Sequence, residues 1–207
     1  MGPKTDQRAA QLVAVDVLTG DVLVDVLVKH TPQHVVCYHT EKSGLTEAHF
    51  SDARKEGKLV KSVAAARRQL FEWNDENTIL VGHALENALR AVGIRHTKVS
   101  THNGVNVMNV IDTQILARNE VRKVIAIQPK WKDGEPPSGL SKLQHLSKSL
   151  CGHIIQADLV KGHDCVEDVY AAREVLLVIN DSRQKLEDWA TEYVRRSRIR
   201  IVGPVVM

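Results

Sequence analysis

The sequence predicts an α/β fold in which helices flank a sheet of short strands. Three observations indicate this class: a valine-rich hairpin over 11–29, a short apolar run at 78–82, and helical stripes that alternate with these strands. Such alternation is typical of an α/β sandwich. The chain has 207 residues, of which 43% are hydrophobic and 4% aromatic. It is therefore long enough for one domain with an aliphatic core.

The first half of the chain is expected to form the hairpin and two helices. The runs 11–18 and 22–29 flank Thr19-Gly20-Asp21, a composition typical of a hairpin turn. Thr46 is a candidate N-cap for a short polar helix. Apolar residues at spacings of three or four predict a helix over 60–73. Its stripe consists of Val63, Ala66, Leu70 and Trp73.

The second half is expected to be mainly helical. After the strand at 78–82, the stripe of Leu85, Ala88, Leu89 and Val92 predicts a helix that ends at Gly93. Structure should resume over 110–113, and the Pro- and Gly-containing segment 130–139 should form a loop. Further helices are predicted over 140–152, 166–179 and 184–196. Trp73 and Trp189 are expected in the core, and Trp131 is expected to be exposed.

The composition excludes several classes of protein. No apolar run approaches the roughly 20 residues of a membrane helix, and the N-terminal residues have no signal core. Cys37, Cys151 and Cys165 form no CxxC pair, which argues against a disulfide framework or a zinc ribbon. We therefore expect an intracellular protein, nuclear or cytoplasmic, that has no contact with membranes. The net charge of +3 permits a polyanionic partner without requiring one.

Four segments, in order along the chain, carry a resemblance. The first is the hairpin at 14–25, and the second is Tyr38-His39-Thr40-Glu41-Lys42-Ser43-Gly44-Leu45-Thr46. The third is Gly82-His83-Ala84-Leu85-Glu86-Asn87-Ala88-Leu89, with Ile111-Asp112-Thr113 downstream. The fourth is Gly162-His163-Asp164-Cys165-Val166-Glu167-Asp168, which continues into Ala171-Ala172-Arg173. Together they resemble the DEDDh 3′→5′ exonucleases, in the RNA exonuclease branch. Leu140-Ser141-Lys142-Leu143 and Ile155-Gln156 also look like that family.

The resemblance spans nearly the whole chain and implies a ribonuclease-H-like mixed sheet flanked by helices. It implies one exonuclease-like domain over 1–207, with a core to about residue 181 and a C-terminal helix and tail over 182–207.

The implied chemistry is two-metal hydrolysis of a phosphodiester. In the family, four carboxylates hold two Mg²⁺ or Mn²⁺ ions about 4 Å apart, one activating water and the other stabilising the leaving oxygen. A histidine accepts the proton of that water. By the resemblance, His163 matches this general base and Asp168 matches the fourth carboxylate. Tyr38, Thr40, Ser43, Gly44 and His83 match the nucleic-acid side of the site, with an ordinary loop as the alternative for the first four.

The family's third carboxylate is not matched in this sequence. Ala88 occupies the position of the third carboxylate, and a methyl group cannot bind a metal. Glu86 cannot replace it, because two helical residues are about 200° apart around the axis. Alternatively, Ala88 simply completes the apolar stripe as helix core.

The start of the chain departs from the family as well. Met1-Gly2 falls where the family continues after its Asp-x-Glu motif, so we expect the central first strand and two carboxylates to be missing from 1–207. Natural loss, a misassigned start codon and truncation are all possible causes. Without that strand, unpaired edges should make the chain poorly soluble or dependent on a partner. Residues 100–109 are either an inserted surface loop or a gene-model artefact.

Three hypotheses follow. The first is an exonuclease-related domain that binds the 3′ end of single-stranded RNA or another nucleic acid, with catalysis impaired or lost and Mg²⁺ or Mn²⁺ binding weak or absent. The second is an active RNA exonuclease whose true N-terminus lies upstream. The third is a non-catalytic protein-interaction module. The basic C-terminal region, which includes Arg183, Lys185, Arg195, Arg196, Arg198 and Arg200, could contact phosphates or form a solvated face.

Overall fold

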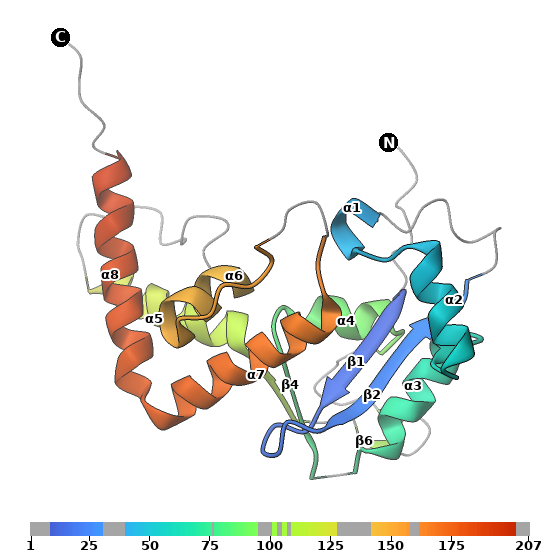
Figure 1. The fold of residues 1–207 in the computed structure, drawn as a ribbon. Helices are drawn as coiled ribbons and strands as arrows, with labels where there is room; N and C mark the ends of the chain where they lie inside the picture. Colours follow the sequence, from blue (N-terminus) through green and yellow to red (C-terminus); the bar gives the residue numbers. More distant parts are fainter. Residues whose placement is uncertain are drawn as a thin grey trace, which may run out of the picture.

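The structure is a computed structural model that describes residues 9–30, 40–75, 77–94, 101–102, 105–106, 109–127, 142–157 and 162–201. Its helices lie beside small sheets, so the predicted α/β class is confirmed (Figure 1). No helix of the described part is long and apolar enough to cross a membrane.

The first sheet contains the predicted hairpin. Strands β1 (Gln11–Val15) and β2 (Val22–Val28) are antiparallel, and β3 (Leu59–Val60) lies parallel to β2. Helices α2 (Glu47–Lys55) and α3 (Val63–Glu72) pack against β2. The alternating residues Val24, Val26 and Val28 turn one face of β2 toward Ala66 of α3. Burial of this valine row is what joins the helix to the sheet.

The second sheet pairs two strands that are distant in sequence. Strand β4 (Ile79–Gly82) lies parallel to β7 (Asn109–Asp112), in a register that sets Gly82 beside Asp112. The intervening described elements are α4 (Leu85–Ala91), β5 (Thr101–His102) and β6 (Val105–Asn106).

The two sheets are not hydrogen-bonded to each other in the described part of the chain. They share an apolar cluster in which Leu12 and Ala14 of β1 and Leu80 of β4 pack around Leu70 and Leu89. Whether a central strand belongs between them stays a prediction.

The C-terminal half is helical. Helix α5 (Thr113–Ala126) packs against α8 (Arg183–Ile201), which extends away from the sheets in Figure 1. Helix α7 (Cys165–Asp181) contacts both β1 and β4. The predicted helix over 140–152 is observed as α6 (Leu143–Leu146) and the π-helix η1 (Ser147–Cys151).

Several details differ from the sequence predictions. Val60 belongs to β3 rather than to a helix, because Ser62 caps α3 and its Oγ accepts from the Ala65 N–H at 3.2 Å. Trp73, expected in the core, is 57% exposed at the C-cap of α3. Ala88 is exposed, so the prediction that it is helix core is wrong. Trp189 packs against the core as predicted, whereas Trp131 lies outside the described residues.

Candidate active site

His163 and Asp168 form a pair at the start of α7. His163 Nδ1 lies 3.1 Å from Asp168 Oδ2, and the two side chains are 55% and 25% exposed. Asp164 caps the helix by accepting from the N–H groups of Val166 and Glu167. This cap starts α7 just after His163, so the imidazole stands before the helix and Asp168 lies in its first turn.

Gln156 holds the other oxygen of the same carboxylate. Its side-chain amide donates to Asp168 Oδ1 at 2.7 Å, and its backbone N–H donates to Glu167 Oε2 at 2.9 Å. Gln156 adopts a left-handed conformation with a φ of 53°, which is uncommon for a residue with a side chain. Both oxygens of Asp168 therefore have a protein partner.

The loop that contains Thr40, Ser43 and Gly44 lies against this pair. It includes α1 (Thr40–Ser43), and the His163 backbone N–H donates to the Lys42 carbonyl at 2.7 Å. A Cβ at Gly162 would lie 2.5 Å from the Gly44 nitrogen, so only glycine permits this approach. The structure thus brings together two of the segments singled out in the sequence. Tyr38 lies outside the described residues.

His83 lies in a separate turn between β4 and α4. Its Nδ1 is 3.0 Å from Thr113 Oγ1, and Thr113 donates to the Gly82 carbonyl at 3.1 Å. Helix α7, which carries Asp168, packs against β4, the strand that leads to this turn.

Asp112 supports that turn from the end of β7. Its carboxylate accepts from the backbone N–H groups of Ala84 at 3.1 Å and Leu85 at 2.7 Å, and from Gln114 at 2.8 Å as the cap of α5. Ala84 has a φ of 51°, a left-handed conformation that is costly for a residue other than glycine. The buried Asp112 therefore stabilises a strained turn next to His83.

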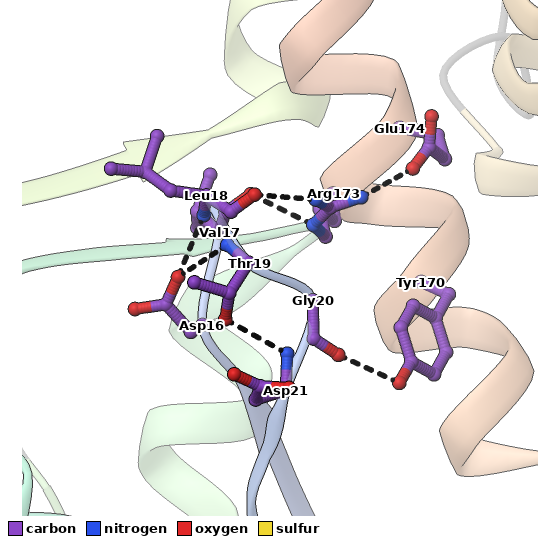
Figure 2. A network of polar contacts seen from close by, with 9 residues as sticks. All are labelled: Asp16, Val17, Leu18, Thr19, Gly20, Asp21, Tyr170, Arg173 and Glu174. Atoms are coloured by element: carbon purple, nitrogen blue, oxygen red, sulfur yellow. Dashed lines mark hydrogen bonds and ion pairs between the residues drawn. The ribbon is translucent and has the colours of Figure 1, made fainter.

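The hairpin turn fixes α7 in position (Figure 2). Arg173 donates from Nε to the Val17 carbonyl at 2.8 Å and from Nη2 to the Leu18 carbonyl at 3.1 Å. Tyr170 donates its hydroxyl to the Gly20 carbonyl at 2.9 Å. These bonds connect the turn between β1 and β2 to the helix that presents Asp168.

The described donor groups do not fit a pair of divalent ions. Asp168 is engaged by Gln156 and His163, and Ala88 offers only a methyl group. Glu86 is 77% exposed and forms an ion pair with Arg90 at 2.6 Å. Among the residues that the structure describes, no three His, Cys, Asp or Glu side chains gather to hold a metal.

Sequence reasoning missed three supports of this site. Gln156 belongs to the Ile155-Gln156 segment that resembles the family, but the sequence does not predict which residue it binds. Neither Asp112 nor Glu167 is predicted as a site residue. Asp112 has a local signal, because Asp before a helical run is a common N-cap. Nothing local identifies Gln156, whose partner Asp168 is 12 residues further along the chain.

Comparison with known proteins points to one group of enzymes. No family model matches the chain. The chain is 31% identical over 169 residues to the putative RNA exonuclease pqe-1 of Caenorhabditis elegans, covering 81% of this chain and 8% of the relative. It is 29% identical over 189 residues to RNA exonuclease 4 of Candida glabrata, covering 90% of this chain and 57% of the relative. The chain thus spans less than two thirds of each of these relatives.

The fold has solved counterparts. The Pan2 pseudoubiquitin hydrolase–RNA exonuclease module of Saccharomyces cerevisiae, solved with AAGGAA RNA, matches with a TM-score of 0.63 and 20% identity over 95% of this chain and 29% of that one. The Neurospora crassa Pan2 catalytic unit matches with a TM-score of 0.60 and 20% identity over 88% of this chain and 26% of that one. The sequence similarity to named RNA exonucleases and the shared fold agree with the four motif segments, and together they support the exonuclease superfamily for this chain, with RNA exonucleases as its relatives.

Proposed function

We propose that this domain binds the 3′ end of single-stranded RNA at His163 and does not hydrolyse it in a metal-dependent reaction. The observation that carries the proposal is the engagement of both Asp168 oxygens, one by Gln156 and the other by His163. Exonucleases of the superfamily generally use Mg²⁺ or Mn²⁺. A metal would have to displace these two partners, and among the described residues no three His, Cys, Asp or Glu side chains gather to bind it.

His163 retains a group that can meet RNA. When Nδ1–H donates to Asp168, Nε2 is left as an acceptor for a ribose hydroxyl. A doubly protonated ring would instead donate from Nε2 to a phosphate oxygen. Asp168 then orients the imidazole, as a carboxylate orients the histidine in hydrolytic triads. The domain thus keeps a side chain that can recognise the 3′ end of RNA. Its described residues form no cluster that could hold the metal ion needed to activate water.

The comparisons support an RNA ligand. The relatives are named RNA exonucleases, and one Pan2 neighbour was solved in complex with RNA. Those names concern longer proteins, and the RNA is carried over to this chain as part of the proposal. Thr40, Ser43, Gly44 and His83 are proposed contacts on the RNA side, as the motif matches imply.

The test uses single-stranded RNA labelled at its 5′ end, with Mg²⁺ present. We expect binding by fluorescence anisotropy and no shortening of the RNA on a gel. His163→Ala should weaken binding, and an RNA with a 3′-phosphate should bind differently from one with a 3′-hydroxyl. Shortening of RNA by the unmodified chain, abolished in His163→Ala, would contradict the proposal. Absence of binding even at low salt would favour a protein-interaction module instead.

A second candidate is an active exonuclease completed by a further strand. It is favoured by the separation of β1 from β4 in the described sheets, since a strand between them could carry an Asp-x-Glu motif. The discriminating experiment is a chain extended upstream that also carries Ala88→Asp. Mg²⁺-dependent decay of RNA by this chain, but not by one that carries Ala88→Asp alone, would establish the candidate. Inactivity of the extended chain in its folded form would exclude it.

A further inference from the structure

A basic groove lies between η1 and α8. Its volume is about 740 Å³, within the range of small-molecule sites. None of its lining residues is acidic. The lining consists of Gln144, His145, Lys148, Ser149, Ile154 and Arg196.

One helical face presents most of these groups. His145, Lys148 and Ser149 are three and four residues apart, so they project from the same side of α6 and η1. All three are exposed. The backbone here is a π-helix, a rare conformation that occurs frequently at functional sites. The facing wall is Arg196 of α8.

The charge of the facing wall stays positive. Glu192 accepts from both Arg195 and Arg196, and the two guanidinium groups lower its pKa to about 2. One carboxylate is thus shared by two cations, which leaves a surplus positive charge on this turn of α8. With Lys148 opposite, the groove is suited to a phosphate backbone.

The groove is structurally connected to His163 and Asp168. Gln144, on the groove wall, donates to the Ile155 carbonyl at 3.2 Å, and the next residue, Gln156, donates to Asp168. Ile154 begins the same short segment and is 64% exposed in the groove lining. It offers apolar surface for a base, and the His145 ring offers a stacking surface.

We propose that the groove is a second contact for single-stranded RNA, in which Lys148 and Arg196 bind phosphates of nucleotides upstream of the 3′ end. This inference rests on the proposed function, because it places the end of the same strand at His163. Single-stranded RNA fits better than a duplex, since the groove offers His145 and Ile154 to exposed base faces.

The experiment measures the affinity of the full chain for two RNAs at a series of salt concentrations. One RNA has about four nucleotides and can occupy only the 3′-end site, whereas the other has about 16 and can reach the groove. The test variant is Lys148→Glu with Arg196→Glu. The matched control is Arg54→Glu with Lys61→Glu, which reverses two exposed charges outside the groove lining, one on α2 and one between β3 and α3. Thermal unfolding of each variant verifies that it is folded.

We expect the test variant to lose roughly 10- to 30-fold in affinity for the long RNA near 0.1 M salt, with a salt slope smaller by about 1.4. Its affinity for the short RNA should change little, and the control should affect neither RNA comparably. Equal losses of affinity for the long RNA in the test and control variants, or no loss in either, would contradict RNA binding in the groove. Neither result would contradict RNA binding at the 3′-end site. Failure of the unmodified chain to bind either RNA would overturn both, and binding of an acidic peptide without RNA would assign the groove to protein.

Discussion

At the scale of single residues, Asp112 connects strand β7 to the candidate site. It is 9% exposed, and its two oxygens accept three backbone N–H groups. Two of these N–H groups belong to the turn where Ala84 adopts its left-handed conformation. The carboxylate therefore offsets backbone strain beside His83, which is how a strained residue persists in a folded protein.

We predict that Asp112→Ala destabilises the protein by about 2–4 kcal/mol, because it leaves buried donors without acceptors and removes the cap of α5. Asp112→Asn should cost less, since Oδ1 can still accept from Ala84 and Gln114. Urea unfolding measures both values. As a control, Asp52→Ala removes an exposed carboxylate whose ion pair is screened by solvent, and it should change the stability little. Equal stability of Asp112→Ala and Asp52→Ala would disprove the support assigned to Asp112.

At the scale of elements, the hairpin turn is attached to α7 by side chains that donate to backbone carbonyls. Arg173 is 15% exposed and its guanidinium spans two carbonyls, whereas Tyr170 makes one bond. Within the turn, Asp16 accepts from the N–H groups of Leu18 and Thr19. The hydrogen bond from the Thr19 N–H is the main cause of the lowered pKa of Asp16. The turn is thus stabilised by hydrogen bonds within it and is attached to α7 by Tyr170 and Arg173.

We predict that Tyr170→Phe costs about 1 kcal/mol, the typical value of one hydrogen bond. Arg173→Met should cost more, because it keeps the packing of the stem but leaves two carbonyls without their donors. Amide exchange should accelerate at residues 16–21 in both variants, while β3 stays unchanged. Exchange that accelerates uniformly over the sheet would show that the contact supports the whole domain rather than the position of the turn.

The α5–α8 interface contains a buried acid with two basic partners. Glu120 is 6% exposed on its side chain and pairs with Lys123 at 3.1 Å and Arg183 at 2.7 Å. Burial acts to raise the Glu120 pKa, but the two cations outweigh it and hold the pKa below the ordinary 4.5. A carboxyl group with a lowered folded pKa stabilises the protein above its unfolded pKa. That contribution is lost as the pH falls through the folded value.

We therefore predict that Glu120→Gln lowers the free energy of unfolding near neutral pH, by about 1–3 kcal/mol for the lost charge-assisted bonds. The deficit should shrink as the pH falls below about 4.5. Urea unfolding from about pH 3 to 7 follows both proteins. Glu72→Gln, at an exposed position of α3, should show no comparable deficit. A deficit for Glu120→Gln that is constant with pH would mean that side-chain shape, rather than charge, is what matters.

Local patterns predicted the hairpin and most helices, because alternation and stripes record burial at short range. Helix α5 was missed although Ala117, Val121 and Ile125 recur at spacings of four and are buried. The π-helix η1 was not predictable from its leucine stripe, since that stripe also fits an α-helix. The motif singled out His163 and Asp168 as candidate site residues, and the structure adds the contact between them. The contacts of this pair with Gln156 and Lys42 depend on how distant segments meet.

At the scale of the whole molecule, helices rather than strand pairing connect the β1–β2–β3 sheet to the β4–β7 sheet in the described part of the chain. Helix α7 contacts both β1 and β4. Its first residue, Cys165, lies near Val13 of β1, and burial raises the pKa of the Cys165 thiol to about 11. A thiol with this pKa is scarcely ionised at neutral pH, so its role at the strand edge is packing rather than reactivity.

The separation of the sheets predicts an alternating pattern of amide exchange along β1. Val28 N donates to the Ala10 carbonyl, and Leu12 and Ala14 follow at alternate positions, so their N–H groups face β2. Those of Gln11 and Val13 face the opposite edge, where no strand of the described residues pairs with β1. We expect Leu12 and Ala14 to exchange much more slowly than Gln11 and Val13, as measured by NMR. Equal protection of all four amides would show that another strand pairs with the edge of β1 opposite β2. In that case, a strand added upstream should leave the exchange rates of the four amides unchanged.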